Sequence, residues 1–190
     1  MNKFIGSIII SGIFTFFLSM SYINVYANPN LYAYGEFETF LELEEAYYQA
    51  IENNDIERQA ELIKIAQDTL NQEIQENTDS LIDINSNSRY LYHPELEAAY
   101  SKHILSSSWI NRNGLISLSV YPNKPDFWSN AEKTAAWNGL AYVHMNNSHW
   151  ANTNSMREQF FCHARLVYAT VKQPWNLEPS KTSINPITCN

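Results

Sequence analysis

Residues 109–121 read Trp-Ile-Asn-Arg-Asn-Gly-Leu-Ile-Ser-Leu-Ser-Val-Tyr, two extended runs that meet at Asn113 and Gly114. Both turn residues tolerate a positive φ, which a tight turn between two antiparallel strands requires. An Asn-Gly pair between alternating apolar and polar residues therefore predicts a β-hairpin with a two-residue turn. This hairpin is the strongest local signal in the chain, and the neighbouring segments are interpreted around it.

The register of the hairpin determines which residues share a face of the sheet. A two-residue turn pairs Arg112 with Leu115, and the same count pairs Trp109 with Leu118. Because side chains alternate along a strand, we expect the apolar residues of the second strand to face the core and its serines to face solvent. The inward set is Ile116, Leu118 and Val120, and the outward set is Ser117 and Ser119.

Helical patterns flank the hairpin on both sides. We expect one short helix over residues 93–105 and two more over residues 129–145 and 155–172. Each of the last two begins with Ser followed three residues later by Glu, which is the pattern of a capping box. Residues 89–190 are therefore predicted to form a small α+β domain, with a β-hairpin or small antiparallel sheet packed by two to three helices.

The chain has two cysteines, Cys162 and Cys189. In an exported protein an even pair indicates one disulfide, which we expect to staple this domain. The chain-entropy model gives such a bond about 3.5 kcal/mol of stabilisation. Two free thiols, or a thiol nucleophile, are the alternatives.

Residues 1–27 have the three parts of a secretory signal peptide. A positive start at Lys3 precedes an apolar run over residues 4–20, and Val25 and Ala27 occupy the two positions that a signal peptidase inspects. We expect cleavage after Ala27 and a secreted, extracellular protein. An uncleaved membrane anchor is the alternative, because the apolar run approaches the length that crosses a bilayer.

Charge divides the remaining chain into two parts. Residues 28–88 carry 14 acidic and 2 basic side chains, whereas residues 89–190 carry 6 acidic and 9 basic ones. The overall charge of −8 therefore describes neither part. We expect no nucleic-acid partner for so acidic a chain, but an anionic ligand for residues 89–190 stays open.

Residues 28–76 have the periodicity of an acidic helical hairpin, and residues 77–88 have the composition of a linker. We expect Asn54, with Glu57 three residues later, to cap the second helix. The hairpin could be a spacer, a prosegment or a cover that docks on the basic domain. Its two apolar stripes are Phe37, Phe40, Leu41, Tyr47, Tyr48 and Ile51, and Ile56, Ala60, Ile63, Ala66, Leu70 and Ile74.

Several segments of the basic part have a combined pattern. They are residues 109–122, the Gln-Phe-Phe-Cys-His of 159–163, the Trp-Asn-Leu-Glu-Pro of 175–179, and the Cys-Asn of 189–190. Together they resemble an uncharacterised bacterial secreted domain, domain of unknown function family 2599, over roughly residues 106–190. This resemblance implies no activity, so function has to be argued from the residues.

His163 follows Cys162, and Glu178 lies in the loop that the disulfide would close. An imidazole oriented by a carboxylate is the minimal general-base arrangement, so His163 and Glu178 are the candidate catalytic residues. The alternative is a structural histidine bonded to Glu178 or to a carbonyl group.

Candidate ligand-binding residues are three cations and one aromatic ring. The cations suit an anionic or cell-envelope ligand, and the indole offers a stacking face. The family pattern has Arg-Pro where this chain has Ser180-Lys181, and Lys181 lacks the two-pronged guanidinium with which an arginine would hold an anion. We expect no metal or cofactor, because the histidine spacing fits no zinc motif. The candidates are Arg112, Lys172, Trp175 and Lys181.

Three functional hypotheses follow. The protein is an extracellular binding or effector module, a small extracellular hydrolase that acts on envelope polymers with a His/Glu acid–base pair, or a structural surface protein. We favour the binding module, because no complete catalytic constellation can be assembled from the sequence.

Overall fold

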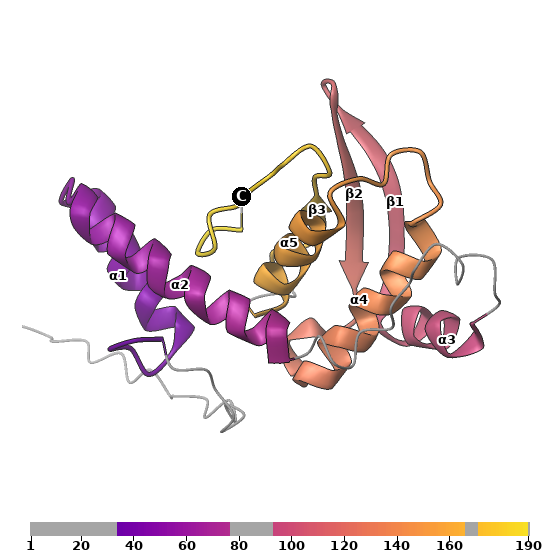
Figure 1. Cartoon of the computed structure of the whole chain (residues 1–190), viewed down its shortest axis with the longest axis horizontal. Coiled ribbons are helices and arrows are strands. Elements are labelled where there is room, and N and C mark those ends of the chain that lie inside the picture. Colours follow the sequence, from indigo (N-terminus) through magenta and orange to yellow (C-terminus); the bar gives the residue numbers. More distant parts are fainter. Residues whose placement is uncertain (1–33, 77–92, 166–170, 190) are drawn as a thin grey trace, which may run out of the picture.

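The computed structural model describes residues 34–76, 93–165 and 171–189 (Figure 1). The predicted signal peptide and linker lie outside the described residues. The elements in chain order are α1 (Phe40–Glu52), α2 (Ile56–Glu76), α3 (Pro94–His103), β1 (Ile104–Arg112), β2 (Leu115–Pro122), the 3₁₀ helix η3 (Pro125–Phe127), α4 (Asn130–His144), α5 (Thr153–Arg165) and β3 (Trp175–Leu177).

The predicted hairpin is β1–β2, and it forms two strands of a three-stranded antiparallel sheet in the order β1-β2-β3. Arg112 pairs with Leu115 and Trp109 with Leu118, as the Asn-Gly turn predicts. Both turn residues have positive φ, 56° at Asn113 and 94° at Gly114. The α+β fold class is therefore confirmed, with β3 as a strand that the sequence did not reveal.

The prediction that Ser117 and Ser119 face solvent is wrong, because their exposed fractions are 0% and 6%. They do lie on the opposite face from Leu118 and Val120, which α4 and α5 cover. However, β2 is the central strand, so residues of β1 and β3 flank it on both sides. One of them, Arg112, donates a hydrogen bond from Nη2 to the Ser117 hydroxyl at 3.0 Å.

The predicted helix caps are partly right. Ser129 and Glu132 form the expected capping box of α4. The predicted box at Ser155 is wrong, because α5 already begins at Thr153 and the Ser155 hydroxyl accepts a hydrogen bond from Gln159 inside the helix. The helix thus begins about half a turn before the position that the local pattern predicts.

The predicted cap of α2, Asn54, is wrong by one residue. Asn54 has a φ of 54°, in the left-handed region. Asp55 takes the capping position instead, and its carboxylate accepts a hydrogen bond from the Arg58 N–H at 3.0 Å. Helix α3, predicted to extend to Leu105, ends at His103, because Ile104 and Leu105 belong to β1.

Helices α1 and α2 form the predicted hairpin at one end of the molecule, with the sheet at the other (Figure 1). Their inward face is rotated from the predicted stripes, since Leu43 and Leu62 are fully buried. Three members of those stripes are instead exposed near the tip of the hairpin, where the domain no longer covers them. They are Tyr48, Ile51 and Ile56.

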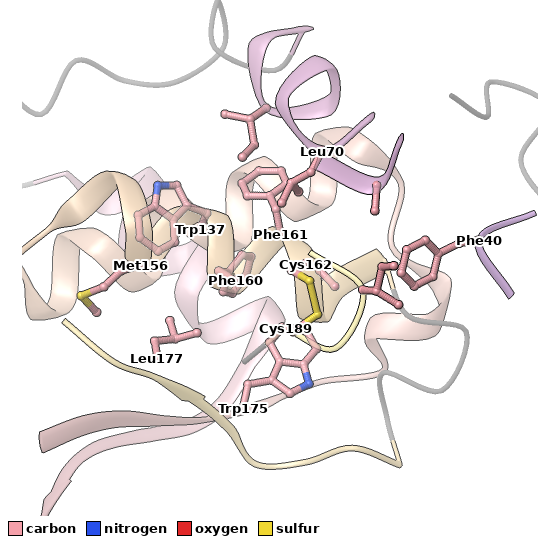
Figure 2. Packing of buried hydrophobic residues seen from close by; sticks show 14 of the residues in the cluster. Phe40, Leu70, Trp137, Met156, Phe160, Phe161, Cys162, Trp175, Leu177 and Cys189 are labelled. Carbon is pink, nitrogen blue, oxygen red and sulfur yellow. A yellow bond between two sulfur atoms is a disulfide. The ribbon is translucent and has the colours of Figure 1, made fainter. Parts of the chain in front are cut away.

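The hairpin packs against the domain in one continuous buried cluster. Leu70 of α2 and Phe161 of α5 belong to this cluster, together with Phe40 of α1 (Figure 2). A buried ion pair between Lys133 of α4 and Glu73 of α2, 2.7 Å long, also crosses the contact. Intramolecular docking of the acidic hairpin, one of the predicted alternatives, is thus present in the structure.

The disulfide between Cys162 and Cys189 is present, and both residues are buried. It ties α5 to the last described residues. Beside it, the Phe160 ring packs within 6.3 Å, centroid to centroid, of Trp128, Trp137 and Trp175. The domain core is therefore an aromatic cluster closed on one side by the disulfide (Figure 2).

Reducing the disulfide should lower the free energy of unfolding by about 3.5 kcal/mol, because the unfolded chain regains the entropy of a loop whose ends are 27 positions apart. Urea denaturation with and without a reductant measures this. The Cys162→Ala/Cys189→Ala variant is the control, since its stability should not respond to the reductant. An equal stability of the oxidised and reduced wild type would contradict the prediction.

Replacing Lys133 by Met should lower the free energy of unfolding by about 3–5 kcal/mol, because the buried Glu73 carboxylate loses its ammonium partner. Lys102→Met is the matched control. Its pair with Glu132 is largely exposed and should contribute under about 1 kcal/mol. Similar losses for both variants in urea denaturation would show that the Lys133 pair does not support the docked hairpin.

Candidate functional site

Three of the predicted site residues meet at the end of the sheet. Arg112 Nη2 lies 2.5 Å from Oε1 of Glu178, and Lys181 Nζ lies 2.9 Å from Oε2 of the same carboxylate. The side chain of Glu178 is 10% exposed, whereas those of Arg112 and Lys181 are 42% and 31% exposed. A sheltered carboxylate thus holds two accessible cations, and this cationic cluster has a net charge of +1.

Local structure explains why Glu178 lies there. The side-chain amide of Gln159, buried in α5, donates to the Glu178 carbonyl at 3.1 Å and accepts from the Glu178 N–H at 2.6 Å. This two-point contact holds the chain just after β3 against α5. The Lys181 N–H then donates to the Glu178 carbonyl, which closes a turn and returns the lysine to the carboxylate.

Arg112 reaches the same carboxylate from the other edge of the sheet. It is the last residue of β1, directly before the tight turn, and its guanidinium crosses β2 past Ser117. Small serines on the central strand leave room for this crossing. On the same face, the amide oxygen of Asn176 is buried and has no hydrogen-bond partner among the described residues.

His163 is not hydrogen-bonded to the cationic cluster among the described residues, and its ring is stacked on Trp175 with 5.7 Å between ring centroids and 11° between planes. Its Nδ1 is buried without a partner among the described residues. Burial, with the nearby Lys172 and Lys181 charges, lowers its pKa to about 4, so the ring is neutral at neutral pH. The described hydrogen bonds include none between His163 and Glu178, and their acid–base pairing stays a prediction.

The other two candidate ligand residues are not part of the cationic cluster. Trp175 is fully buried, with Phe160 and Trp128 also against its ring. It belongs to the core and offers no face to a ligand. Lys172 lies beside the helical hairpin, where its Nζ is 3.4 Å from a carboxylate oxygen of Glu44. The predicted set therefore separates into Arg112 and Lys181, which both pair with Glu178, and two residues that make other contacts.

The structure also brings together three polar side chains that sequence reasoning did not combine. The Ser107 hydroxyl lies 2.6 Å from Nε2 of His144 and 2.7 Å from the Tyr100 hydroxyl. These residues come from β1, α4 and α3, and no local spacing links them. The signal available in the sequence was only that Tyr100 and His144 each lie on the inward side of a helix.

Two further features of the described residues bear on function. They contain no group of three or more His, Cys, Asp or Glu side chains placed to bind a metal ion. None of their helices combines the length and apolar character needed to span a membrane.

The stability of the protein should fall as the pH drops from 6.5 to 4, because an unfolded His163 takes up a proton well before the folded one. Neutral His163 contributes fully above pH 6.5, and roughly 3 kcal/mol is lost by pH 4. His163→Phe keeps a ring on Trp175 but cannot titrate, so its unfolding free energy should depend less on pH. Identical pH dependence of the two proteins in urea denaturation would contradict the buried, neutral state of His163.

Comparison with known proteins covers part of the chain. A family model described as "Protein of unknown function (DUF2599)" matches residues 104–189. No curated protein and no solved structure matches the chain. The match begins at β1 and ends at Cys189, so it includes the sheet, α4, α5, the disulfide and the cationic cluster. The C-terminal part of the chain thus matches the DUF2599 family, in agreement with the resemblance seen in its motifs.

Proposed function

We propose that this chain is an exported bacterial binding module whose ligand is an anionic group on a cell-envelope polymer. The observation that carries the proposal is the convergence of Arg112 and Lys181 on Glu178 at the surface of the sheet. A single carboxylate orients both cations but neutralises only one of them. The site therefore has one surplus positive charge, already held in place before a ligand arrives.

The guanidinium of Arg112 suits this task. Its bonds to Glu178 and Ser117 both use Nη2, and no hydrogen bond among the described residues uses Nε or Nη1. These groups donate in one plane, so a carboxylate or phosphate can accept two parallel hydrogen bonds from one arginine. Lys181 adds a second, more mobile cation beside it. Because both side chains are partly exposed, binding should weaken as salt rises.

Export is part of the proposal and has separate support. Residues 1–27 have the pattern of a signal peptide, and the buried disulfide suits an oxidising compartment. An extracellular module of this kind meets polymers that carry phosphate or carboxylate groups. The acidic hairpin does not cover the cationic cluster through any ion pair described, since its own contacts are to Lys133 and Lys172.

The proposal predicts that the protein binds an immobilised polyglycerol phosphate at low salt, and that Arg112→Gln weakens this binding by about tenfold or more. Biolayer interferometry measures the affinity, with neutral dextran as the second surface. Lys124→Gln removes an equal charge from an exposed position of the same domain and should change the affinity by less than about twofold.

Two results would contradict this function. One is the absence of binding at low salt by a protein whose melting temperature shows that it is folded, which would favour a structural surface protein. The other is an equal loss for Arg112→Gln and Lys124→Gln, which would show that net charge alone attracts the polymer. A polygalacturonate surface, tested in parallel, distinguishes a carboxylate ligand from a phosphate ligand.

A further inference from the structure

Tyr100, Ser107 and His144 form a chain of hydrogen bonds at the edge of the sheet. The Ser107 hydroxyl stands in the middle, 2.6 Å from His144 Nε2 and 2.7 Å from the Tyr100 hydroxyl. All three residues are partly exposed. The hydroxyl of a serine within hydrogen-bond distance of an imidazole nitrogen is the contact from which serine nucleophiles are activated.

The direction of these hydrogen bonds follows from the protonation of His144. Burial lowers the pKa of this histidine, so the ring is neutral at neutral pH and one nitrogen accepts a hydrogen bond. With Nε2 as that acceptor, the Ser107 hydroxyl donates to it and accepts from the Tyr100 hydroxyl. Tyr100 thus places a donor on the serine oxygen, where negative charge develops when the serine proton leaves.

We propose that Ser107 and His144 are the nucleophile and general base of an esterase site, with Tyr100 as a positioning residue for the serine oxygen. The Ser107 Oγ adds to the carbonyl carbon of a carboxylic ester while its proton passes to His144 Nε2. The tetrahedral intermediate expels the alcohol, which takes that proton, and leaves an acyl-serine. Water attacks the acyl group, gives its proton to Nε2 and releases the acid, and the proton returns to Ser107.

The strand that carries Ser107 also supplies a donor for the tetrahedral intermediate. Arg112 and Leu115 close a two-residue turn and form a hydrogen-bonded pair, so alternate pairs along the ladder are hydrogen-bonded. Ser107, opposite Val120, falls at a non-hydrogen-bonded position. Because β1 is an edge strand, the Ser107 N–H points away from the sheet, toward the side where an oxyanion would form beside Oγ.

Aromatic rings fix the orientation of the base. The Trp109 ring meets the His144 ring edge-on, with 6.1 Å between centroids and 85° between planes. The Tyr100 ring also contacts the His144 ring, with 6.5 Å between centroids. Two residues on, Trp109 shares the sheet face of Ser107, whereas Arg112 of the cationic cluster lies on the opposite face. The esterase site is therefore independent of the proposed ligand-binding site.

The test is covalent labelling of the full chain with a fluorophosphonate, followed by peptide mass spectrometry. We expect one adduct, on Ser107, and we expect Ser107→Ala to abolish it. His144→Gln should slow labelling by about 100-fold or more, because the serine loses its base. Ser108→Ala is the matched control, since its side chain is exposed on the other face of β1 and labelling should be unchanged.

Hydrolysis of p-nitrophenyl acetate gives an independent readout, and thermal melting shows which variants are folded. Tyr100→Phe removes one hydroxyl but keeps the ring, so it should retain the fold and lower the rate of hydrolysis at unchanged KM. If Ser107→Ala does not fold, two results still test the esterase site. They are the identity of the labelled residue in the wild type and the rate of hydrolysis by Tyr100→Phe. No adduct on the folded protein, or an adduct at another residue, would overturn the proposal.

Discussion

A buried guanidinium at the end of α5 joins three parts of this chain. Arg165 donates from Nη1 to the carbonyl of Ala66 in α2 and from Nη2 to the carbonyl of Pro186 in the C-terminal segment. Its charge also lies 4.6 Å from the centre of the Phe40 ring in α1. Burial lowers the pKa of Arg165, while nearby Tyr34 and Glu73 act in the opposite direction. Carbonyl oxygens, an aromatic face and a nearby carboxylate are the groups that make a buried cation tolerable.

The position of Arg165 follows from a helix that is buried on several sides. In α5, Phe160 enters the aromatic core, Phe161 enters the cluster shared with the helical hairpin, and Cys162 binds Cys189. Gln159 holds the chain beyond β3. This one helix therefore contacts the helical hairpin, the segment after β3 and the C-terminal segment. The cationic cluster and the Tyr100–Ser107–His144 chain lie on opposite faces of the sheet that α5 supports.

The features that could be predicted from the sequence are those set by residues a few positions apart in the chain. The Asn-Gly turn fixed the register of β1 and β2, and Ser129 with Glu132 marked the start of α4. The two cysteines paired because there was no other partner for either. The convergence of Arg112 and Lys181 was anticipated only as a list of candidate residues, since Glu178, which binds both, lies 66 positions after Arg112.

The failures share a physical cause, which is contact between distant segments. A three-residue strand is too short to show periodicity, so the burial of Ser117 and Ser119 beside β3 could not be foreseen. Trp175 looked available for stacking because a sequence cannot show that Phe160 and His163 cover it. The hydrogen bond between Ser107 and His144 joins residues 37 positions apart, on elements whose packing no local pattern specifies.

The acidic and basic parts of the chain are in contact in the folded protein. The acidic hairpin looked like a separable unit, yet Glu73 and Glu44 of that hairpin pair with Lys133 and Lys172 of the basic domain. Its apolar side chains belong to the same buried cluster as the disulfide. The hairpin and the DUF2599-like domain thus share one buried cluster, from which we predict that they unfold as one cooperative unit.

Native-state hydrogen exchange of the full chain tests this prediction most directly. The account predicts that the backbone amides of Leu62, Ala66 and Leu70 in α2 exchange only through global unfolding, with the same opening free energy and denaturant dependence as Phe161 and Cys162 in α5. If the α2 amides instead open at a free energy several kcal/mol lower, with little dependence on denaturant, the hairpin is a separate and weakly docked unit.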